Sequence, residues 1–122
     1  MKEKQSILYV QTSGVDRPER TYAPLILATT AAAMGIDATV YFLGMGVTNV
    51  KTGEAEKVKL GTFPSLADVV KRAVDAGVRL LVCDQSTQML GLSRGDYVEP
   101  AEVVGAATLN DLALDADALI SF

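Results

Sequence analysis

Apolar and polar residues follow one another along the chain in blocks that predict strands and helices in turn. Residues 6–11 form a short apolar run with β-branched members, and residues 37–43 form a second one. Both runs are typical of buried strands. Between them, residues 22–34 are apolar on almost every side, which predicts a helix buried on more than one face. Thr21 is its expected N-cap and Gly35 its expected end.

The second half of the chain continues this alternation with shorter elements. Ser65 begins a capping-box pattern and an apolar stripe that predict a helix ending at Gly77. The apolar run 78–82 is long enough for a buried strand and too short for a helix. The remaining expected elements are a short helix over 86–90, a strand over 102–106, a helix over 109–114 capped by Thr108 and a last strand over 117–122.

The order of these elements indicates an α/β fold. Strands that alternate with helices favour a mostly parallel sheet with right-handed crossovers. We expect a single domain over residues 1–122, built as a three-layer sandwich around a five-stranded sheet in the flavodoxin-like order 2-1-3-4-5. Residues 47–62 fit neither pattern, apart from one helical turn expected near 47–50, and we expect a mobile connection there.

Composition excludes several kinds of chemistry. The chain has a net charge of −4, no histidine and one cysteine. The acidic balance and the lack of a basic stripe argue against nucleic acid as a partner. Without histidine, zinc sites built from His and Cys and catalytic Cys–His or Ser–His pairs are excluded, and we expect no metal and no cofactor. The apolar runs are too short to span a membrane and the charged start lacks a signal-peptide core, so we expect a cytoplasmic setting.

The single cysteine directly follows the apolar run 78–82. Cys83 is therefore expected at the carboxyl end of a strand, the edge at which ligands collect in open α/β sheets. Asp84, Ser86 and Thr87 follow it as candidate N-caps of a helix. The start of that helix would stabilise a reactive thiolate, whereas the charge of Asp84 would oppose it. On the residues alone, a small buried hydrophobe at a strand end is the commoner role of such a cysteine.

Other loops of the predicted sheet end at the same edge. The candidate ligand-binding residues there are Ser13, Gly14, Gly44, Met45, Gln85, Ser86 and Thr87. The hydroxyl and N–H groups of Ser86 and Thr87 could hold an anion, although helix capping is their commoner role. Gly44 and Gly46 look like half of a dinucleotide-binding fingerprint, but the third glycine and the helix behind it are missing. We therefore favour a turn over nucleotide binding.

Three motifs and the end of the chain occur in a set order. They are Val82-Cys83-x-x-Ser86, Met89-x-Gly91-Leu92, Val104-Gly105-Ala106-Ala107-Thr108 and Ala116-Asp117-Ala118-Leu119-Ile120-Ser121-Phe122. This ordered set resembles the DsrE/DsrF-like family of sulfur-relay proteins. The resemblance implies a small α/β domain that assembles into homotrimers or hexamers. It also implies a cysteine at the end of the third strand that carries sulfane sulfur as a persulfide, and Cys83 stands at that position.

Two functional hypotheses follow. In the leading one, Cys83 accepts sulfane sulfur from a donor protein or small sulfur compound and passes it to a partner thiol. The competing one is a non-catalytic oligomeric binding module that holds a small anion or a protein partner at the carboxyl ends of the strands. It is motivated by the missing histidine and by Asp84 beside the thiol. The apolar helix over 22–34 is the candidate subunit interface, unless it is simply buried under the sheet.

Overall fold

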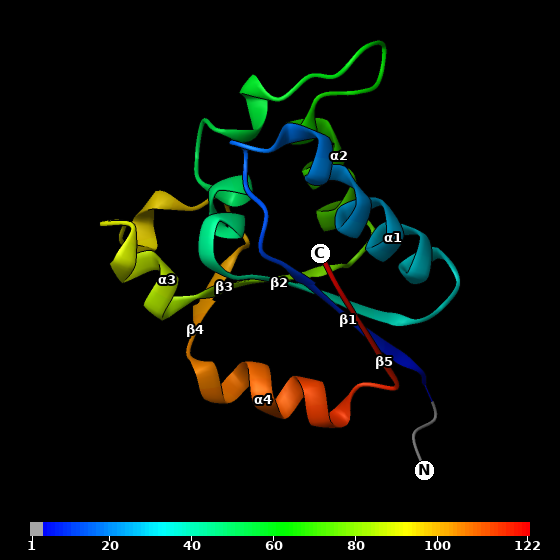
Figure 1. The fold of residues 1–122 in the computed structure, drawn as a ribbon. Coiled ribbons are helices and arrows are strands. Elements are labelled where there is room, and N and C mark those ends of the chain that lie inside the picture. The colour runs from blue at the N-terminus through cyan, green and yellow to red at the C-terminus, as the bar shows by residue number, and fades with distance from the viewer. Residues whose placement is uncertain (1–3) are drawn as a thin grey trace.

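The computed structural model describes residues 4–122, and these fold into a parallel sheet with helices on both faces (Figure 1). The strands are β1 (Ser6–Gln11), β2 (Asp37–Phe42), β3 (Arg79–Cys83), β4 (Glu102–Val104) and β5 (Ala118–Ser121). The α-helices are α1 (Tyr22–Ala33), α2 (Leu66–Asp75), α3 (Asp84–Met89) and α4 (Ala106–Asp115). Short 3-10 helices are η1 (Pro18–Arg20), η2 (Gly44–Val50), η3 (Ala55–Lys57) and η4 (Arg94–Asp96).

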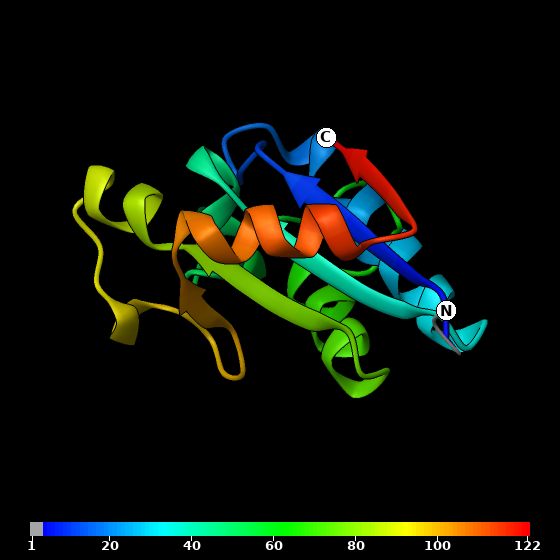
Figure 2. The same ribbon diagram turned by 90° about the horizontal axis from the view of Figure 1, so that it is seen from below.

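The strands lie in the order β4-β3-β2-β1-β5, and each neighbouring pair is parallel. The expected α/β architecture with a five-stranded sheet between helical layers is confirmed. The order differs from 2-1-3-4-5, because β3 pairs with β2 and β5 occupies the second edge of β1. The crossovers explain this order. Helices α1 and α2 cover one face while the chain advances from β1 to β3, and α4 crosses the opposite face on the way back to β5 (Figure 2).

Local signals set most element boundaries. Helix α2 begins where expected, since the Ser65 hydroxyl accepts the Asp68 N–H at 3.2 Å and an apolar stripe faces the core. Two expected side-chain caps are not made. Thr21 lies at the N-cap of α1, but its hydroxyl donates to the Pro18 carbonyl and makes no side-chain cap. Helix α4 starts at Ala106, before the expected Thr108 cap, because the alanines there favour helix.

Two further expectations change in the structure. Helix α1 is buried on one side only. Leu25 and Ala28 lie on its buried side, and Leu27 lies on its exposed side. The segment 47–62 is not a loose connection throughout. Val47 lies fully buried in η2, and Val58 also belongs to the main core, so the segment is anchored by apolar packing up to that point.

The sheet separates two apolar clusters. The larger cluster lies under α1 and α2, and the smaller one lies under α4. The smaller cluster consists of Leu8, Val10, Tyr41, Leu81 and Cys83, with partly buried α4 side chains packed on it. The cysteine side chain therefore lies on the α4 face of the sheet, at its carboxyl edge.

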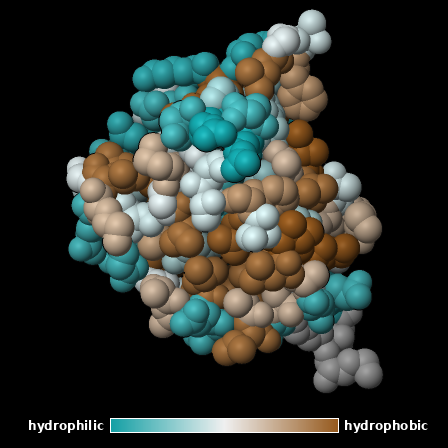
Figure 3. Space-filling model, viewed as in Figure 1, coloured by the Kyte–Doolittle hydropathy of each residue, from teal (hydrophilic) through white to brown (hydrophobic). Residues whose placement is uncertain are grey.

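Apolar side chains remain exposed along the β5 edge. Leu119 and Ile120 of β5 are 47% and 41% exposed, and Leu27 of α1 is 41% exposed. In Figure 3, the hydrophobic colour spreads over the region where Figure 1 draws α1 and β5. Such a continuous apolar area is typical of a contact surface. Within residues 4–122, no helix is long and apolar enough to cross a membrane.

Candidate functional site

Cys83 is both the last residue of β3 and the N-cap of α3. The backbone N–H of Ser86 donates to the Cys83 sulfur at 3.4 Å, so the cysteine caps the helix that was expected to be capped by Asp84, Ser86 or Thr87. Those three residues lie inside the helix. The thiol also donates to Oε1 of Gln85 at 3.7 Å, and Cys83 is only 4% exposed. The sulfur is therefore held at the helix start and shielded from solvent.

Two of the predicted site residues link the start of α3 to other parts of the chain. The Ser86 hydroxyl accepts the Gly44 N–H at 2.7 Å, and Gly44 has a φ of 58°, a conformation that favours glycine. Thr87 donates to the Cys83 carbonyl at 2.9 Å and shares a 2.7 Å hydrogen bond with the Tyr97 hydroxyl. Both hydroxyls thus already have partners within the protein, which makes their role structural in this arrangement.

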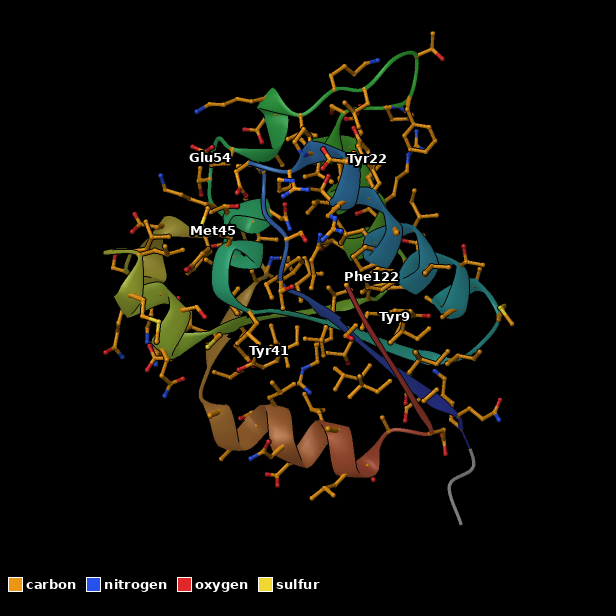
Figure 4. All side chains as sticks on the ribbon, viewed as in Figure 1. Tyr9, Tyr22, Tyr41, Met45, Glu54 and Phe122 are labelled. Carbon is orange, nitrogen blue, oxygen red and sulfur yellow. The ribbon has the colours of Figure 1, made fainter. Side chains whose placement is uncertain are left out.

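The other predicted residues form a separate group beyond β2. Gly14 packs so closely on η2 that an added Cβ would overlap the Met45 carbonyl and the Thr48 hydroxyl. The Ser13 carbonyl accepts a 2.9 Å hydrogen bond from Asn49. The Met45 side chain is 39% exposed on η2 beside α3 (Figure 4). This group follows β1 and β2 at the same sheet edge, but its hydrogen bonds stabilise the loops and do not reach the cysteine.

Tyr41 is the site residue that sequence reasoning missed. Its register partner in β3 is Leu81, so Cys83 is its diagonal neighbour on the same face. The Tyr41 hydroxyl donates to the Gly105 carbonyl at 3.3 Å. Burial, followed by interaction with the Cys83 side chain and the charge of Asp84, raises the pKa of Tyr41 to about 12. Only the β2–β3 register reveals this pairing.

The charges around the cysteine are few. Arg17 is paired with Glu19, and Lys51 is paired with Glu54. In residues 4–122, no lysine or arginine makes an ion pair or hydrogen bond with Cys83 or Asp84, and no acidic or cysteine cluster there is suited to a metal ion. The positive partial charge near the sulfur therefore comes from backbone N–H groups.

One hollow in the described surface does not belong to this site. It has a volume of about 500 Å³ and lies at the amino ends of the strands, beside Asp37, Thr39 and Arg79. Cys83 lies at the opposite ends of the strands. A ligand in that hollow would not contact the thiol.

The fold and site define an α/β protein with a single cysteine at the carboxyl edge of a parallel sheet. The model of the DsrE/DsrF-like family matches residues 5–122, and the chain belongs to this family. The ychN protein from E. coli has a similar fold, with a TM-score of 0.82, 20% identity, and coverage of 97% of this chain and 99% of that one. MTH1491 from Methanobacterium thermoautotrophicum gives a TM-score of 0.68 at 16% identity, over 98% of this chain and 100% of that one.

Curated relatives occur in archaea. The uncharacterized protein MJ0760 of Methanocaldococcus jannaschii is 29% identical over 84% of this chain, which spans only 37% of that longer protein. The uncharacterized protein MJ0989 of the same organism is 28% identical over 85% of this chain and 88% of its own length. The uncharacterized protein MK0008 of Methanopyrus kandleri is 27% identical over 77% of this chain and 72% of its own. The names of these relatives supply no activity.

Proposed function

We propose that this protein is a sulfur carrier in which Cys83 holds sulfane sulfur as a persulfide and passes it to a partner thiol. The observation that carries the proposal is the placement of the chain's only cysteine at the carboxyl edge of the sheet, with its sulfur accepting the Ser86 N–H. A backbone N–H stabilises negative charge on sulfur, and the thiolate is the form that attacks sulfur donors. Family membership adds support for sulfur relay.

The proposed reaction is an exchange of one S–S bond for another. The Cys83 thiolate attacks the outer sulfur of a donor persulfide R–S–SH and forms a new S–S bond. The donor S–S bond breaks, and R–S⁻ leaves with the electron pair, so Cys83–S–SH forms without net oxidation. An acceptor thiolate then attacks the outer sulfur of Cys83 and regenerates the Cys83 thiolate. Neither step needs histidine, because the thiolates are the nucleophile and the leaving group.

Access to the buried sulfur is part of the proposal. Gln85 is exposed and its side-chain oxygen lies 3.7 Å from the Cys83 sulfur. An exposed side chain changes rotamer within nanoseconds, so Gln85 can uncover the sulfur without unfolding of α3. The protein would act in a reducing, cytoplasmic setting, where the thiol stays free.

The test is intact-mass measurement after incubation with glutathione persulfide, for the wild type and for Cys83→Ser. We expect a gain of one sulfur atom on the wild type that dithiothreitol reverses, and none on the variant. Serine is a good N-cap, so the variant keeps the start of α3. A wild-type protein that gains no sulfur, although iodoacetamide alkylates its thiol, would overturn sulfur carriage and favour the binding module at the strand ends.

A second pair of variants tests the route to the sulfur. Gln85→Ala removes the side chain next to the thiol and should increase the alkylation rate of Cys83. Gln88→Ala is the matched control, because Gln88 lies on the same short helix and bonds only the exposed carboxylate of Asp84. Equal rates for both variants and the wild type would show that another element controls access.

The proposal includes self-assembly through the exposed apolar area. That area comprises Leu27 on α1 and Leu119 and Ile120 on β5. Burial of such side chains between two copies would remove apolar surface from water at about 25 cal/mol per Å². Light scattering should report an oligomer for the wild type and a smaller species for Ile120→Lys. A monomeric wild type would contradict this part of the proposal and leave the chemistry of Cys83 unaffected.

A further inference from the structure

We propose that the Tyr41 hydroxyl is a positioning group for the sulfur of Cys83. It donates to the Gly105 carbonyl while the sulfur is a neutral thiol, and it turns to donate to the sulfur when the sulfur is charged as a thiolate or a persulfide. The inference rests on the proposed function, because it concerns the same cysteine. It assigns a role to a side chain outside the helix start.

The strand register places the Tyr41 and Cys83 side chains on neighbouring strands and on the same face of the sheet. Tyr41 pairs with Leu81 in the β2–β3 register, and Cys83 pairs with Val104 in the β3–β4 register. The hydroxyl reaches the carbonyl of Gly105, the residue directly after Val104. The ring therefore extends from β2, past β3, to the end of β4, on the face that also carries the Cys83 side chain. Figure 4 shows Tyr41 between the sheet and α4.

The present hydrogen bond of Tyr41 is easily exchanged. The oxygen–oxygen distance to Gly105 is 3.3 Å, longer than the usual 2.7–2.8 Å for an O–H donor. Tyr41 is fully buried, so water does not compete for the hydroxyl. A charge-assisted bond to an anionic sulfur is roughly twice as strong as a neutral one. Once the sulfur is charged, the new hydrogen bond to the sulfur is therefore stronger than the bond to Gly105 that is given up.

Tyr41 is suited to donate and not to act as a base. Its pKa is raised to about 12 by burial and by the neighbouring Cys83 and Asp84, so the phenol keeps its proton at physiological pH. The other titratable groups that act on the cysteine or its surroundings are Asp84 on α3 and Tyr97 after η4. Asp84 cannot donate when it is ionised. The Tyr97 hydroxyl already shares a 2.7 Å hydrogen bond with Thr87.

The test is the pH dependence of iodoacetamide alkylation in Tyr41→Phe. Cys83 is the only cysteine, so the measured rate belongs to it alone. Loss of one charge-assisted hydrogen bond should move the midpoint of the rate profile upward by about one pH unit. Tyr9→Phe is the matched control, since it removes a buried hydroxyl that bonds the Leu27 carbonyl on the opposite face of the sheet. Its midpoint should equal that of the wild type.

The midpoint separates positioning from packing, because changed access alters the plateau rate and leaves the midpoint in place. Replacement of the tyrosines by 3-fluorotyrosine keeps every hydroxyl and makes the phenol a stronger donor, so the midpoint should fall. A folded Tyr41→Phe protein with the wild-type midpoint would overturn the inference. So would an unchanged midpoint in the fluorinated protein, or a wild type without any alkylation below pH 10.

The two proposals fail in different ways. If the wild type gains no sulfur from glutathione persulfide but the midpoint still moves in Tyr41→Phe, sulfur carriage fails and the positioning role stands. If the wild type gains sulfur and the midpoint does not move, only the role of Tyr41 fails. In the expected case the wild type gains sulfur and the midpoint moves in Tyr41→Phe. The persulfide of Tyr41→Phe then loses its outer sulfur to a thiol acceptor at a rate different from that of the wild type.

Discussion

Gly46→Ala tests whether close packing requires a glycine in the turn after β2. Gly46 has no positive φ, so alanine meets no conformational penalty there. A Cβ at this position would lie 2.9 Å from the carbonyl carbon of Gln11 and closer still to its oxygen. That oxygen accepts the Leu43 N–H at 2.9 Å, where the chain leaves the β1–β2 pair. The added methyl group must therefore displace backbone at the edge of the sheet.

The expected cost of Gly46→Ala comes from overpacking. Inserting a methyl group into a well-packed region typically costs about 1–3 kcal/mol, and backbone neighbours place this site near the upper end. For a chain of this length, about 3 kcal/mol lowers the melting temperature by about 10 °C. Urea unfolding followed by far-UV circular dichroism measures the free energy, and calorimetry measures the melting temperature.

Two other glycines are matched controls. Gly44 has a φ of 58° and open space around its Cβ position, so Gly44→Ala should cost about 1 kcal/mol through backbone strain alone. Gly95 has neither a positive φ nor a neighbour within 4 Å, so Gly95→Ala should change stability by less than about 0.5 kcal/mol. The reasoning is refuted if Gly46→Ala is as stable as Gly95→Ala, or if Gly44→Ala is the most damaging of the three.

The remaining predictions concern stability. The pKa of Tyr41 is about 12 in the folded state, against the ordinary value of 10.0 in the unfolded state. Between pH 10 and pH 12 the unfolded state loses this proton more readily than the folded state, so the folded state loses stability as the pH rises. The loss from this group is at most about 2.7 kcal/mol, and urea unfolding at pH 9 and pH 11 should show a smaller loss in Tyr41→Phe. Ser65→Ala removes the cap of the Asp68 N–H and should cost about 1 kcal/mol, measured by urea unfolding. Leu25→Ala should cost about 2–5 kcal/mol in the same assay, because Leu25 is fully buried. Lys71→Ala should change the unfolding free energy by less than about 0.5 kcal/mol, because its ion pair is exposed.

Several elements could be predicted from the chain because their signals are local. The apolar run 6–11 is strand β1 with the expected bounds, and the Ser65 cap with its apolar stripe is helix α2. Gly35 and Gly77 end their helices at positive φ. Each signal acts within a few residues. It is the spacing of apolar side chains, a hydrogen bond to a nearby N–H, or the ability of glycine to adopt a positive φ.

The candidate site could be predicted in part. The short apolar run before Cys83 was enough to place the cysteine at a strand end and at a helix start. It did not reveal that the sulfur itself caps α3, since Ser and Thr are the stronger capping residues by type. Nor did it reveal that Ser86 bonds the turn after β2, a contact between residues far apart in the chain.

The sequence by itself therefore determined the α/β alternation, the main helix and strand positions and the location of the one thiol at the sheet edge. Only the tertiary structure decided the order β4-β3-β2-β1-β5, the burial of Cys83 and its proximity to Tyr41. The physical reason is the range of the interactions. Period and capping act between near neighbours, whereas strand order and register depend on which faces of distant segments pack together.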